Sequence, residues 1–153
     1  MSTQLWPSLP LEEWEDSKIT LHLYCQILGK IRLALTPRMN HWWNVTLYVS
    51  SRGLTTGPIP YGDRIFEMEL DFLEHRLTIH TSDGQLRTLA LQPRSVADFY
   101  AEVISALRSL GIQVTMLPKP LGVPMTTPFT DDQRARCLQC GVRQPLLVGT
   151  RGG

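Results

Sequence analysis

An imidazole between an amide and an indole is the group in this chain best suited to chemistry. Asn40, His41 and Trp42 stand where a helical pattern ends and an alternating pattern begins. A histidine titrates near neutral pH, so it can act as a general base or bind a ligand. His41 is therefore the candidate catalytic residue. The simpler interpretation, which we favour, is that His41 caps a backbone carbonyl beside core tryptophans.

Three cations stand close enough in sequence to join His41 in an anion pocket. Lys30 and Arg32 lie near the end of the predicted helix that precedes His41, and Arg52 follows the next predicted strand. The candidate ligand-binding residues are Lys30, Arg32, Asn40, His41 and Arg52. The alternative is that these cations are simply solvated on the surface.

Two other groups of residues fit chemistry less well. Cys137 and Cys140 have the spacing of zinc ribbons and redox pairs, but tetrahedral zinc needs four ligands and no second pair is nearby in sequence. Glu67, Glu69 and Asp71 alternate along one strand, where such a row normally faces solvent. The sequence also lacks nucleophile motifs and phosphate-binding glycine loops. We therefore expect no metal and no cofactor.

The composition is that of one ordinary globular domain. The chain has 153 residues, 42% of them hydrophobic and 19% charged, and a net charge of +1. A net charge this small gives no electrostatic attraction that would favour nucleic acid or an anionic membrane as a partner. No apolar run approaches the roughly 18 residues of a membrane span. The odd cysteine count and the absence of a signal-peptide pattern at the start indicate a cytoplasmic protein.

Two helices and a set of strands must position these residues. Apolar side chains recur every fourth residue from Ile19 to Leu35, which predicts an amphipathic helix that ends at Thr36-Pro37. Ser95 is a good N-cap for a second helix, and Gly111 is a good C-terminal stop.

Alternation predicts strands at 43–49, 66–72, 77–80 and 86–91, with a further strand at 112–116. The glycine- and proline-rich stretch 51–63 is expected to be an irregular loop with room for a short strand at 54–56. The order predicts an α+β fold: an antiparallel β-meander with two amphipathic helices packed on one face. We expect a domain at 1–117, a proline-rich linker at 118–133 and a disordered tail at 134–153.

Several ungapped motifs resemble DUF5996, an uncharacterised bacterial family of unknown function. They are LPLEEW at 9–14, QILGKIRLA at 26–34, NHWW at 40–43, LTTGPIPYG at 54–62 and PRSVADFY at 93–100. The resemblance covers about residues 5 to 130, and it implies a fold but no activity.

The resemblance also implies a longer protein. Family members run to about twice this length and continue after the proline-rich linker with H-A-S-Y-D and then R-F-W. From about Arg134 this chain reads differently. If the codons after about Arg134 are read one base out of frame, they can encode H-A-x-Y and R-aromatic-W. These two motifs then have the spacing found in the family. We expect that 134–153 is out-of-frame translation and that a second half is missing; the alternative is a divergent short tail.

Two functional hypotheses remain. The first is a cytoplasmic binding or structural domain without catalysis. The second is an enzyme fragment whose polar site near His41 is completed by the missing half. Under both hypotheses, the surface that would contact the missing half is exposed. We therefore expect a marginally stable chain that can self-associate through this surface.

Overall fold

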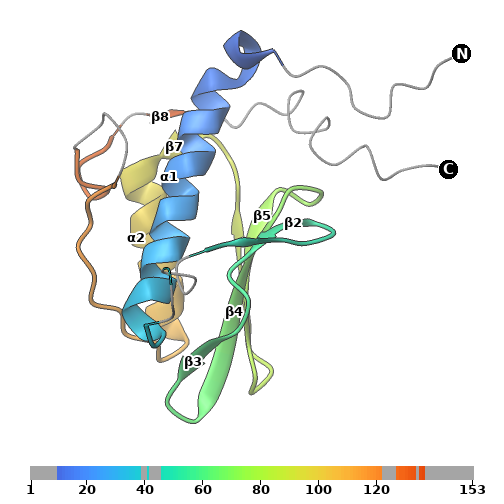
Figure 1. Ribbon diagram of the computed structural model, residues 1–153, viewed down its shortest axis with the longest axis vertical. Helices are drawn as coiled ribbons and strands as arrows, with labels where there is room; N and C mark the ends of the chain where they lie inside the picture. Colours follow the sequence, from blue (N-terminus) through green and yellow to red (C-terminus); the bar gives the residue numbers. More distant parts are fainter. Residues whose placement is uncertain (1–9, 39–40, 42–45, 122–126, 134, 137–153) are drawn as a thin grey trace, which may run out of the picture.

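Two helices lie against one face of a six-stranded antiparallel sheet (Figure 1). The computed structural model describes residues 10–38, 41, 46–121, 127–133 and 135–136. Within them, α1 (Leu11–Leu35) and α2 (Val96–Ser109) form the helical layer. The predicted α+β fold is thus confirmed. Neither described helix combines the length and the apolar character that crossing a membrane requires.

The ends of both helices follow local rules. Pro10 is the N-cap of α1, and Thr36 is its C-cap. The residue before a proline disfavours the helical conformation, so α1 stops before Pro37. The hydroxyl of Ser95 accepts a hydrogen bond from the Asp98 N–H at the start of α2. Gly111 follows α2 with φ of 76°, which glycine adopts without strain.

The sheet is organised around one long central strand. Its strands are β1 (Tyr48–Val49), β2 (Gly53–Thr55), β3 (Ile59–Tyr61), β4 (Arg64–Asp71), β5 (Arg76–Thr81) and β6 (Leu86–Ala90). The order across the sheet is β1-β2-β4-β5-β6, and β3 also pairs with β4. Met68 lies opposite Ile79 and Leu70 opposite Leu77, so one face of β4 and β5 is continuously apolar.

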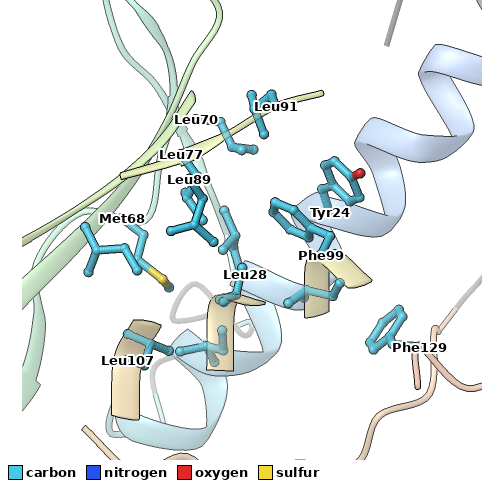
Figure 2. Packing of buried hydrophobic residues seen from close by; sticks show 14 of the residues in the cluster. Tyr24, Leu28, Met68, Leu70, Leu77, Leu89, Leu91, Phe99, Leu107 and Phe129 are labelled. Carbon is cyan, nitrogen blue, oxygen red and sulfur yellow. The ribbon is translucent and has the colours of Figure 1, made fainter. Parts of the chain in front are cut away.

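The core lies between that apolar face and the two helices. The rings of Tyr24 on α1 and Phe99 on α2 stack with centroids 3.7 Å apart and planes 13° from parallel (Figure 2). The buried apolar side chains of α1 are Leu23, Tyr24, Ile27, Leu28 and Ile31. The predicted helical stripe is therefore buried at its centre, whereas Ile19 and Leu35 at its ends are half-buried.

The structure departs from four local expectations, although the short strand expected at 54–56 is present as β2. The stretch 51–63 contains two strands, β2 and β3, and 112–116 is extended but pairs with no strand in the described chain. Val49 was expected on the apolar face of its strand, but it is 84% exposed because β1 lies at the sheet edge. Trp43 and Val45, from the same predicted strand, lie outside the described residues. Asp71, expected in solvent, is 2% exposed.

Gly53 allows β2 to lie close against β4. A Cβ atom there would stand 2.0 Å from the Leu70 carbonyl oxygen, well inside van der Waals contact. Only a residue without a side chain fits this approach.

The chain after α2 returns along the helices on the side away from the sheet (Figure 1). We call Leu117–Leu121 the strap. Beyond it, Phe129 is 1% exposed and lies against Tyr100, with ring centroids 6.1 Å apart. The Phe129 N–H donates to the Pro118 carbonyl at 2.6 Å. A two-stranded ribbon, β7 (Arg94–Ser95) with β8 (Ala135–Arg136), joins this stretch to the start of α2.

Candidate functional site

His41 stands on the surface just after α1. Its side chain is exposed, and its backbone adopts the left-handed conformation, with φ of 56°. A non-glycine residue in this region marks a tight change of chain direction. Asn40, the neighbouring candidate, lies outside the described residues.

Arg32 is part of the protein interior. Its side chain is buried, and Nη1 donates to the Thr46 carbonyl oxygen. The guanidinium carbon lies 5.1 Å from the centre of the Tyr48 ring, a cation–π distance. Arg32 therefore attaches the segment before β1 to α1, and it is buried instead of solvated.

Arg52 is held by two carboxylates at the turn between β1 and β2. Its Nε donates to Asp71 Oδ2 at 2.6 Å, and its Nη2 lies 3.8 Å from Glu74 Oε1. Asp71 Oδ1 also accepts from the N–H groups of Leu73 and Glu74. Burial raises the pKa of Asp71, but these hydrogen bonds and the Arg52 charge outweigh it, so the pKa falls below its ordinary value.

A groove of about 450 Å³ runs over the outer side of α1. Its floor is the helix itself, and its sides come from the β1–β2 region and from the end of the strap. The lining residues are His22, Cys25, Gln26, Gly29, Lys30, Leu47, Leu54 and Leu121. A volume in this range is that of a small-molecule site.

Gln26 fixes one side of the groove by binding the strap backbone. Its Nε2 donates to the Leu121 carbonyl at 2.6 Å, and its Oε1 accepts from the Leu121 N–H at 2.8 Å. The same Nε2 lies 2.9 Å from Nε2 of His22, which must accept because an amide nitrogen only donates. Leu121 thus keeps its place through its backbone, while its side chain remains 66% exposed beside the groove.

The groove contains one cation and one unreactive thiol. Lys30 Nζ donates to the Leu117 carbonyl over a long 3.4 Å, and partial burial lowers the pKa of the ammonium. Burial raises the pKa of Cys25 to about 12, so this residue is a neutral thiol at physiological pH. A neutral thiol is a poor nucleophile.

Two smaller hollows lie along α2, of about 320 and 300 Å³. Both are bordered by Ile104 and Arg108, and they include polar positions such as Thr115 and Thr130. Their walls are also partly apolar, with Leu107, Ile112 and Val114 in the first and Ala97, Tyr100 and Ala101 in the second, but each is smaller than the α1 groove. The groove on α1 is therefore the better candidate site.

The structure does not gather Lys30, Arg32 and Arg52 into one pocket. Lys30 lines the groove, Arg32 is buried against Tyr48, and Arg52 is engaged by Asp71 and Glu74. Lys30 and Arg32 are two positions apart on a helix and so point in different directions. Ligand binding by these residues stays a prediction. In the described part of the chain, no three His, Cys, Asp or Glu side chains gather as a metal site would require.

Sequence reasoning missed His22, Cys25 and Gln26 as site residues. With Gly29 and Lys30 they follow the i, i+3, i+4, i+7, i+8 spacing of one helix face. A stripe of small and polar residues beside the apolar stripe was the available signal. Leu47, Leu54 and Leu121 carried no such signal, because they reach the groove only through tertiary structure.

Comparison with known proteins places the chain in a family. The sequence model of a protein family described as "Family of unknown function (DUF5996)" matches residues 6–140. The chain belongs to this family. The match runs from before α1 to beyond β8, so this DUF5996 member carries the whole groove within the matched range. No curated protein and no solved structure matches the chain.

Proposed function

We propose that this DUF5996 protein is a binding domain without catalytic activity of its own, and that its ligand occupies the α1 groove. The observation that supports this proposal is the groove itself. It has a volume of about 450 Å³, Leu47, Leu54 and Leu121 form its sides, and the buried Gly29 forms part of its floor. Mostly apolar walls with a few polar groups are the usual make-up of a small-molecule site.

The chemistry of the lining supports binding over catalysis. Cys25 and His22 are the pair of residue types that a thiol nucleophile would need. Cys25 is a protonated thiol at neutral pH, and His22 accepts a hydrogen bond from Gln26. Neither side chain is prepared for nucleophilic attack. A reduced cysteine in the groove also fits the cytoplasmic location that forms part of this proposal.

The alternative site around His41 has less support. Of the cations expected beside it, Arg32 is buried in the protein, and Arg52 is neutralised by Asp71 and Glu74. The His41 imidazole is exposed, and proton transfer there would need other groups to hold a substrate beside it.

A fragment screen by NMR tests the proposal. Small apolar compounds of about 15 non-hydrogen atoms, including neutral, anionic and cationic members, are added singly to the ¹⁵N-labelled full chain. We expect amide shifts to cluster at Cys25, Gly29, Leu47 and Leu54. Shifts confined to the hollows along α2, or no binding by any fragment, would refute a binding site at this groove.

Two leucines of the strap make a matched pair of variants. Leu121→Ser removes an apolar wall but keeps the backbone bonds to Gln26, so fragment affinity should fall. Leu117→Ser changes a side chain that is 76% exposed and does not line the groove, so affinity should not change. Equal effects from the two variants would mean that the fragments bind elsewhere.

A further inference from the structure

We propose that the natural ligand of the α1 groove is a small amphipathic carboxylate, with its head group at Lys30 and its apolar chain between Leu54 and Leu121. This inference rests on the proposed binding function and adds the chemical class of the ligand. It is carried by the charge, the shape and the size of the groove.

The charge of the groove is positive and uncompensated. None of the described residues that line it is acidic. Among the described residues, no carboxylate lies within ion-pair distance of Lys30, in contrast to Arg52, Arg64 and Arg94. Within the described part of the chain, the Lys30 ammonium donates to the neutral Leu117 carbonyl, over 3.4 Å. A ligand anion would therefore meet a partly desolvated cation without displacing an existing ion pair.

The groove combines a polar row on α1 with apolar side chains from the sheet and from the strap. His22, Gln26 and Lys30 recur every fourth residue on α1 and present an imidazole, an amide and an ammonium in a row. Leu47 and Leu54 stand on the sheet side of the groove, and Leu121 stands at the strap. The floor is the Cys25 thiol and the bare backbone of Gly29, so an unbranched apolar chain meets no polar group there.

The size of the groove limits the ligand to a medium chain. A volume of about 450 Å³ holds roughly 15 non-hydrogen atoms if each occupies about the 30 Å³ of a water molecule in the liquid. A carboxylate with about ten carbons fits this limit, whereas a membrane phospholipid exceeds it.

Decanoate, decanamide and decyltrimethylammonium are the probes for a head-group test. They share a ten-carbon chain length and differ in head-group charge. Isothermal titration calorimetry on the full chain should give decanoate an affinity at least about fivefold higher than decanamide, because the charged head group gains a charge-assisted hydrogen bond. The cationic probe should bind most weakly of the three.

Two charge-removing variants locate the head group. Lys30→Gln should weaken decanoate at least about fivefold and leave decanamide unchanged, since only the anion uses the ammonium. Arg76→Gln, on an exposed position of the open sheet face, removes the same charge away from the groove and should change neither affinity. Circular dichroism shows whether each variant is folded.

The outcomes separate this inference from the proposed function. If decanoate and decanamide bind equally, or if Lys30→Gln weakens both alike, the carboxylate class is wrong while the groove remains a binding site. If the effect of Arg76→Gln equals that of Lys30→Gln, the attraction is a property of net charge, and the Lys30 head-group site is refuted. If no probe binds and the fragment screen is also negative, both proposals fail.

Discussion

Asp71 shows how one buried carboxylate fixes a turn. It accepts hydrogen bonds from two backbone N–H groups and from the Arg52 side chain, while it is 2% exposed. A buried charge is tolerated only when such partners replace the lost water. The residue therefore holds the β1–β2 turn against the end of β4, and it leaves Arg52 unavailable to bind an external anion.

Replacing Asp71 with asparagine should destabilise the protein by about 1–3 kcal/mol at pH 7, because the variant loses the charge-assisted bonds. The folded-state pKa of Asp71 is lowered, so its contribution is present above the unfolded-state pKa and disappears as pH falls through the folded-state value. The free-energy difference between wild type and Asp71→Asn should therefore shrink below about pH 4. Urea unfolding at pH 7 and at pH 3 measures both effects.

Asp63→Asn provides the control, because Asp63 is exposed in the turn before β4. Its effect should lie within about 0.5 kcal/mol at either pH. A destabilisation by Asp71→Asn that persists unchanged into acid would show that packing, and not the carboxylate charge, holds the turn.

At the level of elements, the helical layer is closed by a stretch that looks like a linker in sequence. Prolines at 118, 120, 124 and 128 suggest an open connection, yet Phe129 is 1% exposed and its N–H is bonded to the Pro118 carbonyl. Figure 2 shows its ring beside α2, apart from the side chains that come from the sheet. One aromatic residue thus extends the core around the outer side of α2.

Phe129→Ala should cost about 3–5 kcal/mol of unfolding free energy, since truncating a buried aromatic ring removes its burial and leaves a cavity. The midpoint of urea denaturation measures the loss. Leu117→Ala is the control in the same stretch, because that side chain is 76% exposed and should change stability by less than about 0.5 kcal/mol. Similar small losses from both variants would place Phe129 outside the cooperative core.

At the level of the whole molecule, the exposed apolar side chains near β1 matter most. Val49 is 84% exposed and Tyr48 is 46% exposed on an edge strand of only two residues. Unpaired strand edges with apolar side chains tend to associate with other chains. From the sequence, self-association was expected only as an option, on surface meant for a second half. We now predict that copies of this chain associate through β1.

Size-exclusion chromatography with light scattering should show a mass that rises with protein concentration. Val49→Lys should return the chain to monomer, because a lysine on an edge strand opposes pairing. Leu86→Lys makes the same change on β6, at the other edge of the sheet, and should have no effect. A constant monomeric mass for wild type, or an equal response to Leu86→Lys, would contradict contact through β1.

Local patterns predicted the helices and the central strands, because caps and alternation are set by neighbouring residues. The Ser95 cap, the stop at Thr36 and the alternation of Phe66, Met68 and Leu70 all belong to this class. The groove could not be predicted in this way. It brings Cys25 and Lys30 together with Leu54 and Leu121, whose proximity depends on how layers pack. The burial of Arg32 and Asp71 was not predicted, because the identity of a charged residue does not reveal its tertiary partners.

The proposed out-of-frame tail lies largely outside the described residues and stays a prediction. The nucleotide sequence after codon 134 would decide it.

The stacking of Tyr24 on Phe99 has a consequence for synthesis on the ribosome. About 75 residues separate the two rings, so at roughly 5–20 residues per second the first waits some 4–15 s for the second. During that interval the newly made α1 lacks α2, its partner within the helical layer. We therefore expect nascent chains halted between the two rings to be captured by chaperones, and chains extended past Phe129 to escape them.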